Sequence, residues 1–253
     1  MHEDHPGAGG SLFITGFPAG AWSTNCYVLA TGPGEPCVIV DPGQDSIDRV
    51  HEIIAENRLV PAAVMLTHGH MDHVWSVAPV TRDFDVPALI HSADRYRLAD
   101  PAGSSLVAAR EQLLAMTKDS LELTEPSDVQ LLPSGDSERS STIEIAGIEF
   151  GVRHAPGHTE GSVVFDIPGA GQPDVLLSGD VLFQGSIGRT DLPGGDPAAM
   201  DVSLRTVIWP MGDDTIVLPG HGGQTTIGAE RSANPFLQAA AAGGSAQSPQ
   251  RGF

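Results

Sequence analysis

Four side chains that can bind a metal ion occur close together in the segment THGHMDH, residues 67–73. His68 and His70 lie two positions apart in a turn, so they can point toward one ion. Asp72 and His73 follow where the next helix is expected to begin, so they can turn toward a second ion. Imidazole and carboxylate groups suit Zn²⁺ and other first-row divalent ions. The segment therefore predicts a metal site.

Three more candidate ligands lie in later turns, each of which contains glycine. They are His158 in HAPGHTEGS, Asp180 in LLSGD and His221 in VLPGHGG. Taken singly, each is typical of an ordinary turn histidine or a capping aspartate. Together with residues 67–73 they complete a set of seven side chains that can hold two ions.

Short apolar runs lead into these turns and must position them. The runs are residues 37–40, 62–66, 175–177 and 216–218, and each ends at a turn with glycine and a polar residue that can bind metal. Runs of this length predict buried strands. In α/β sheets the crevice beyond the strand ends is where ligands bind, so we expect one shared site.

The rest of the sequence alternates strand and helix patterns. A helix should follow residues 41–43, with Asp45 or Ser46 as its N-cap and an apolar face of Ile47, Val50, Ile53 and Ile54. Further helices are predicted near residues 105–117 and 198–209, and a hairpin turn at residues 146–147. Further strands are predicted at residues 12–15, 27–30, 88–90, 142–145, 149–153 and 162–165. The mixture indicates an α/β fold with partly antiparallel sheets.

The pattern HxHxDH followed by separated His, Asp and His closely resembles that of the metallo-β-lactamase superfamily, over residues 12–237. The resemblance implies a four-layered αβ/βα sandwich, in which two mixed β-sheets pack face to face and are flanked by helices. The metallo-β-lactamase domain would span residues 11–237. Residues 1–10 and 238–253 are rich in Gly, Ala, Ser and Pro, and we expect them to be disordered.

The resemblance also implies a ligand set for two divalent ions, with zinc as the first choice and iron or manganese as alternatives. Asp180 would bridge both ions, and Asp41 would support the metal loop from behind the ligands. The first ion would bind His68, His70 and His158, and the second Asp72, His73 and His221.

Residues 179–196 and 226–237 narrow the resemblance to small, single-domain glyoxalase II-like (hydroxyacylglutathione hydrolase-like) enzymes of bacteria. This implies a binuclear thioester hydrolase that cleaves a small-molecule 2-hydroxyacyl-thiol with a metal-bound hydroxide, and with Asp72 and Asp180 as catalytic residues. The thiol carrier stays open, because the longer helical domain that binds glutathione in two-domain relatives does not follow residue 237.

Arg189 stands where those enzymes carry a lysine that binds glutathione. An arginine can clamp a carboxylate with two hydrogen bonds, so Arg189 is the candidate substrate-binding residue. An ion pair with Asp191 or Asp196 is the structural alternative.

A persulfide dioxygenase of the same fold is the alternative activity. Such enzymes share the GRTD segment, residues 188–191, and hold a single iron with residues that correspond to His68, His158 and Asp180. A secreted β-lactamase should begin with a signal peptide and a nuclease should offer a basic groove, and neither feature is evident.

The overall charge limits the partners. With 13 basic and 32 acidic residues the formal net charge is −19, which repels nucleic acid and anionic membranes, so neither is expected as a partner.

Cys26 and Cys37 fit no zinc pattern and are predicted to be buried thiols. No signal peptide or stretch of membrane-spanning length is evident, so we expect a cytoplasmic protein. We expect structural roles for His91 and His154, and the sequence does not predict an oligomeric state.

Overall fold

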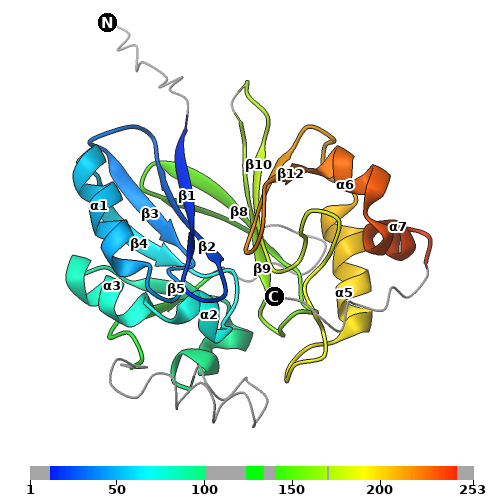
Figure 1. Cartoon of the computed structure of the whole chain (residues 1–253), viewed down its shortest axis with the longest axis horizontal. Helices are drawn as coiled ribbons and strands as arrows, with labels where there is room; N and C mark the ends of the chain where they lie inside the picture. The colour runs from blue at the N-terminus through cyan, green and yellow to red at the C-terminus, as the bar shows by residue number, and fades with distance from the viewer. Residues whose placement is uncertain (1–11, 101–123, 134–140, 170, 244–253) are drawn as a thin grey trace, which may run out of the picture.

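Two six-stranded β-sheets form the centre of the molecule (Figure 1). The computed structural model describes residues 12–100, 124–133, 141–169 and 171–243. The first sheet has the order β1-β2-β3-β4-β5-β6. Its strands are β1 (Phe13–Ala19), β2 (Thr24–Ala30), β3 (Pro36–Val40), β4 (Val60–Met65), β5 (Ala88–Ile90) and β6 (Val129–Leu131).

The second sheet has the order β12-β11-β10-β9-β8-β7. Its strands are β7 (Ser141–Ile145), β8 (Ile148–His154), β9 (Val163–Ile167), β10 (Val175–Gly179), β11 (Ile216–Pro219) and β12 (Thr225–Thr226). Both sheets are mixed, because β3 to β6 run parallel in the first and β10 pairs parallel with β11 in the second, while the other neighbours are antiparallel.

Helices cover the outer face of each sheet (Figure 1). Near the first sheet lie α1 (Ile47–Asn57) and α3 (Val77–Phe84), with the shorter α2 (Met71–Val74) and the 3₁₀-helix η1 (Ser92–Leu98). Beside the second sheet lie α5 (Pro197–Ser203), its π-helical continuation η3 (Leu204–Ile208), α6 (Ile227–Ala233) and α7 (Pro235–Ala241).

Central strands such as β2, β3 and β10 are apolar on both faces because the middle of each sheet is buried on both sides. In β2, Cys26 and Val28 pack toward the core under α1 and α3, whereas Tyr27 and Leu29 pack between the two sheets. On the far side, a third core lies between the second sheet and α5, η3 and α7. Three cores between four layers confirm the predicted αβ/βα sandwich and explain why the strands read as continuous apolar runs.

The predicted ligand turns all follow strands that point to the same edge of their sheet. In the first sheet, β3 and β4 are parallel and lead to Asp41 and to residues 67–73. In the second sheet, β8 and β10 both run antiparallel to β9, and β11 runs parallel to β10, so all three end on one side. Hydrogen bonds join the two edges, from Asn25 N to Gly220 O at 2.7 Å and from Val163 N to Thr67 O at 2.8 Å.

Most predicted elements are confirmed, including the helix after Ser46 and the turn at residues 146–147. At the C-terminal end, α7 runs to Ala241, beyond the domain boundary expected at residue 237. The helix predicted near 105–117, residues 1–10 and residues 244–253 lie outside the described part of the chain. No helix in the described part is long and apolar enough to cross a membrane.

Candidate metal centre

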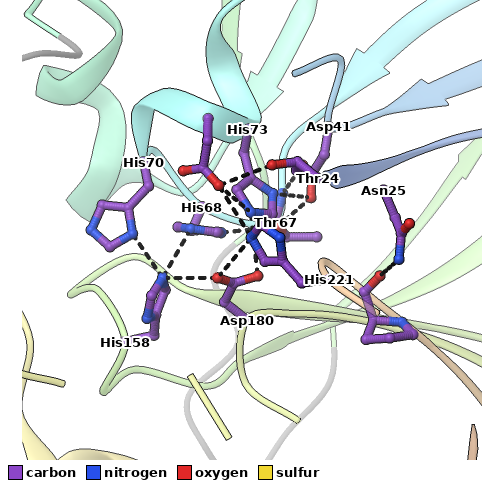
Figure 2. Close-up of polar contacts among 12 residues, drawn as sticks. Thr24, Asn25, Asp41, Thr67, His68, His70, His73, His158, Asp180 and His221 are labelled. Atoms are coloured by element: carbon purple, nitrogen blue, oxygen red, sulfur yellow. Dashed lines mark hydrogen bonds and ion pairs between the residues drawn. The ribbon is translucent and has the colours of Figure 1, made fainter. Parts of the chain in front are cut away.

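All seven predicted ligands meet where the edges of the two sheets adjoin, and Figure 2 shows the five histidines and Asp180 pointing toward one another. Their donor atoms form three overlapping groups, and within each group the atoms lie within 4.8 Å of one another. The groups are His68, His70 and His158; His68, His73 and Asp180; and Asp72, His73 and His221. Two of these groups are the ligand sets that the sequence predicted. We call His68, His70 and His158 the first group, and Asp72, His73 and His221 the second group.

Asp180 lies between the first and second groups (Figure 2). Its Oδ2 atom is 3.4 Å from His158 Nε2 and 3.6 Å from His221 Nε2. Its Oδ1 atom is 3.2 Å from His73 Nε2. A carboxylate placed in this way can bind an ion on either side, as expected of a bridging ligand.

Three of the imidazoles are held from behind by acceptors. The Nδ1 atom of His158 lies 2.7 Å from the carbonyl oxygen of Arg189, and that of His221 lies 3.1 Å from the carbonyl oxygen of Trp22. His73 Nδ1 lies 2.9 Å from Asp41 Oδ2. Because these oxygens can only accept, each Nδ1 carries a proton, and Nε2 is the atom that faces the cluster and can bind an ion once it is deprotonated. This is how the outer contacts of metal-binding histidines fix their tautomer.

Asp41 supports the metal loop as predicted. Its carboxylate accepts hydrogen bonds from the backbone N–H of Thr67 at 2.9 Å and from the Thr67 hydroxyl at 2.6 Å, besides contacting His73. One buried carboxylate therefore fixes the start of the loop and the orientation of one of its ligands.

The arrangement of the first group fits a cation. His158 Nε2 lies 2.7 Å from His70 Nδ1 and 3.1 Å from His68 Nε2, so three ring nitrogens converge on a small volume. Converging imidazole lone pairs repel one another unless a proton or a metal ion lies between them, and His and Asp donors are typical of zinc and iron sites.

The two groups differ in how readily their histidines are protonated. Burial lowers the pKa of His68, His70 and His158 below its ordinary value. Burial also opposes charging of His73 and His221, but the carboxylates of Asp180 and Asp72 outweigh it, so the pKa of both histidines is raised. The first group is therefore neutral at pH values where the second still holds protons.

The two carboxylates of the cluster stay ionised. Burial raises the pKa of Asp72 and Asp180, but the charges of His73 and His221 outweigh burial and lower both pKa values. The Asp72 side chain is also the most exposed of the seven, at 20%, against 7% for Asp180 and 4% for His158. Solvent therefore reaches the cluster beside Asp72.

The candidate substrate residue Arg189 forms the ion pair that the sequence left as its alternative. Its Nε donates to Asp191 Oδ1 at 2.7 Å and its Nη2 donates to Asp191 Oδ2 at 2.9 Å. The carbonyl oxygen of the same residue holds His158, so this segment supports the first group through its backbone.

His91 and His154 stack on each other, with ring centroids 4.2 Å apart, and neither belongs to a potential metal-binding group in the described part of the chain. Cys26 and Cys37 are fully buried free thiols, as predicted, and burial raises the pKa of Cys37 to about 12.

Sequence reasoning missed several residues that support the site. Thr24 donates its hydroxyl to Asp72 Oδ2 at 3.0 Å, and the Asn25 amide donates to the carbonyl oxygens of Pro219 and Gly222, on either side of His221, at 3.0 and 2.9 Å. The polar pair Thr24-Asn25 at the start of an apolar strand was the available signal. Asp94, on η1, was also missed, although it is fully buried and contacts two of the ligand loops.

Comparison with known proteins agrees with this geometry. The sequence profile described as Metallo-beta-lactamase superfamily matches residues 19–221. An uncharacterized protein of Mycobacterium tuberculosis (strain H37Rv) is 46% identical over 230 residues, covering 90% of this chain and 98% of that protein. The hydroxyacylglutathione hydrolase GloC of Haemophilus influenzae is 32% identical over 222 residues, covering 87% of this chain and 95% of that protein.

Two solved structures are similar in both fold and sequence. The BLEG-1 B3 metallo-beta-lactamase matches with a TM-score of 0.75 and 37% identity, over 89% of this chain and 99% of that one. TTHA1623 in a di-iron-bound form matches with a TM-score of 0.68 and 34% identity, over 88% of this chain and 99% of that one.

Proposed function

We propose that this chain, which belongs to the metallo-beta-lactamase superfamily, is a two-ion metallohydrolase that cleaves the thioester bond of a small 2-hydroxyacyl-thiol. The observation that carries the proposal is the placement of Asp180 between two complete groups of ligands. The similarity to hydroxyacylglutathione hydrolase GloC supports the thioester as the bond that is cleaved. Zinc is the proposed metal, and the di-iron form of TTHA1623 makes iron the alternative.

Different residues of the cluster would have different roles in such a reaction. When bound, two divalent cations would lower the pKa of a water molecule and polarise the carbonyl group under attack. The Asp72 side chain is 20% exposed and ionised, so its carboxylate can accept a proton at the solvent side of the cluster. Asp180 holds the two groups together, and a thiolate leaves without help from a general acid because thiols are acidic compared with alcohols.

The charge of the cluster suits an anionic substrate. Asp72 and Asp180 are the only carboxylates among the seven ligands, so two divalent ions and one hydroxide would leave the loaded cluster with a net charge of about +1. We assign Arg189 as the candidate contact for a substrate carboxylate, which would have to compete with Asp191 for the guanidinium group.

A β-lactam is the second candidate substrate, because the BLEG-1 B3 metallo-beta-lactamase is 37% identical to this chain. The same ligands can serve both reactions, since each begins with attack of water on a carbonyl carbon. The leaving group differs: an amide nitrogen must be protonated as it leaves, whereas a thiolate need not be.

The test measures turnover of three substrates. The Zn²⁺-loaded protein is assayed with a 2-hydroxyacyl-thiol and with a β-lactam. An iron-loaded sample is assayed with a persulfide, and its turnover is measured as oxygen uptake. We expect thiol release from the thioester at a rate well above the other two reactions, and loss of nearly all of it in Asp180→Asn. The matched control is Asp166→Asn, which alters a carboxylate on β9 that binds Arg153 on β8 and leaves the cluster intact. Full turnover with two ions in Asp180→Asn, or faster turnover of either other substrate, would refute the proposal.

A further inference from the structure

We propose that Asp94 is a positioning residue that sets the distance between the loop of His68 and His70 and the loop of His158, and thereby the affinity of the first group for its ion. The inference rests on the proposed function only through the metal centre, not through the thioester.

The carboxylate of Asp94 ties the two ligand loops together. Its Oδ2 accepts the backbone N–H of Gly69 at 2.7 Å, between the two ligands of the first loop, and the hydroxyl of Thr159 at 2.7 Å, next to His158. Its Oδ1 accepts the backbone N–H of Gly161 at 2.9 Å, in the second loop, and Arg97 Nε at 3.3 Å. Four donors use the whole accepting capacity of one carboxylate.

Steric contact fixes the same spacing. A Cβ atom added at Gly69 would lie 2.7 Å from Arg97 Cβ and Cδ, and one added at Gly161 would lie 2.6 Å from Asp94 Cγ and its backbone N. Both loops therefore approach η1 as closely as glycine allows. The 3₁₀-helix acts as a spacer whose surface determines where each loop can lie.

Arg97 compensates the buried charge and extends the network to a third segment. Its side chain is 1% exposed, and its Nη2 donates to Glu160 Oε2 at 2.7 Å and to the carbonyl oxygen of Pro193 at 3.0 Å. The segment that contains Pro193 also contains the Arg189 carbonyl that holds His158. Asp94 and Arg97 therefore form a buried ion pair whose hydrogen bonds go to the ligand loops, and we infer that its role is to hold those loops in place.

The second group has different supports. Asp41 contacts His73, Thr24 contacts Asp72 and the carbonyl oxygen of Trp22 contacts His221. None of these contacts involves Asp94 or Arg97. A change at Asp94 should therefore weaken binding at one group and spare the other.

The substitution Asp94→Asn isolates the hydrogen bonds. Whichever way the amide is turned, its NH₂ must face either the N–H of Gly69 or the N–H of Gly161, so one backbone contact is lost while side-chain volume is kept. Loss of such an outer contact reduces metal affinity by about 10- to 100-fold. The readout is the dissociation constant for Zn²⁺, measured by competition with a chelator.

Two single-ligand variants allow Zn²⁺ binding at each group to be measured separately. His221→Gln removes a ligand of the second group, and His70→Gln removes a ligand of the first. We expect Asp94→Asn to weaken Zn²⁺ binding by about 10- to 100-fold in the His221→Gln background and by less than about twofold in the His70→Gln background. The matched control is Asp166→Asn, since Asp166 also contacts an arginine and a close-packed glycine, Gly151, but neither ligand loop. It should change neither constant.

Unfolding temperatures of the metal-free variants test a merely structural role. If Asp94→Asn lowers the unfolding temperature and weakens both groups equally, or if it leaves both constants unchanged, the proposal is wrong. If Asp94→Asn does not fold, Thr159→Val is measured in its place, because it removes only one of the four hydrogen-bond donors to the Asp94 carboxylate. It should weaken the first group alone, by a smaller factor. None of these readouts requires turnover, so the result is distinct from the test of the thioester hydrolase.

Discussion

The metal ion of the second group should be lost at a higher pH than that of the first as the solution is acidified. Histidine binds metal only when it is neutral, so a proton and an ion compete for the same nitrogen. The carboxylates around His73 and His221 raise the pKa of both above the ordinary value of 6.5, whereas burial lowers the pKa of His68, His70 and His158.

The magnitude follows from the number of protons displaced. Below its raised pKa each of His73 and His221 must release a proton, and each proton costs a factor of about 10 in affinity per pH unit. The two rings repel as cations, so one to two protons are displaced and Zn²⁺ affinity falls by about 10- to 100-fold per unit. The first group, already neutral at pH 7, should change little until the pH falls well below 6.5.

The assay is chelator competition at several pH values between about 6 and 7.5 on His221→Gln and His70→Gln, which leave the first and the second group respectively. A steep slope in His70→Gln and a shallow one in His221→Gln are expected. Equal slopes, or a steeper slope for the first group, would show that the carboxylates do not control protonation of His73 and His221.

Four further outcomes are expected. Asp41→Asn should lower Zn²⁺ affinity by about 10- to 100-fold, measured by chelator competition, because it weakens the contacts to Thr67 and His73; unchanged affinity would contradict this. In steady-state kinetics, Asp191→Ala should lower KM for an anionic acyl-thiol by freeing Arg189, and Arg189→Ala should raise it; a KM that does not move in either variant would remove Arg189 from the substrate site. Phe150→Ala should lower the free energy of unfolding by about 3–5 kcal/mol in urea titration, because Phe150 is fully buried between the sheets, and a loss below about 1 kcal/mol would contradict that packing. Added salt should raise kcat/KM for an anionic acyl-thiol but not for a neutral one, because salt screens the −19 charge; a fall for the anionic substrate would show that the local field of the cluster dominates.

The fold and the convergence of the candidate ligands could be predicted because both leave local marks in the sequence. Strands buried on both faces read as continuous apolar runs, as at residues 37–40, and ligands are recognised by residue type in a turn after such a run. The helix at residues 235–241 is harder to predict because alanine-rich sequence suggests low complexity. Alanine also favours helix strongly, and Asn234 caps α7 by accepting from the N–H groups of Phe236 and Leu237.

The supporting residues could not be predicted because their partners are distant and are mostly backbone groups. Asp94 is 25 residues from Gly69 and 67 from Gly161, and a backbone N–H has no identity in a sequence. Arg189 illustrates a different limit. Residue type alone allowed either a substrate contact or an ion pair with Asp191, and only the three-dimensional structure shows that the two side chains are in contact.

The supports of the second group bear on the choice between a two-ion hydrolase and a one-iron dioxygenase. A single iron would need only His68, His158 and Asp180, which belong to the first group and the bridge. Yet each ligand of the second group has its own outer contact: His73 with Asp41, Asp72 with Thr24 and His221 with the carbonyl oxygen of Trp22. Orienting three side chains costs conformational entropy, and burying two of them near carboxylates costs desolvation. An occupied second site would offset both costs, whereas a one-iron enzyme would leave them uncompensated, and this favours the two-ion hydrolase.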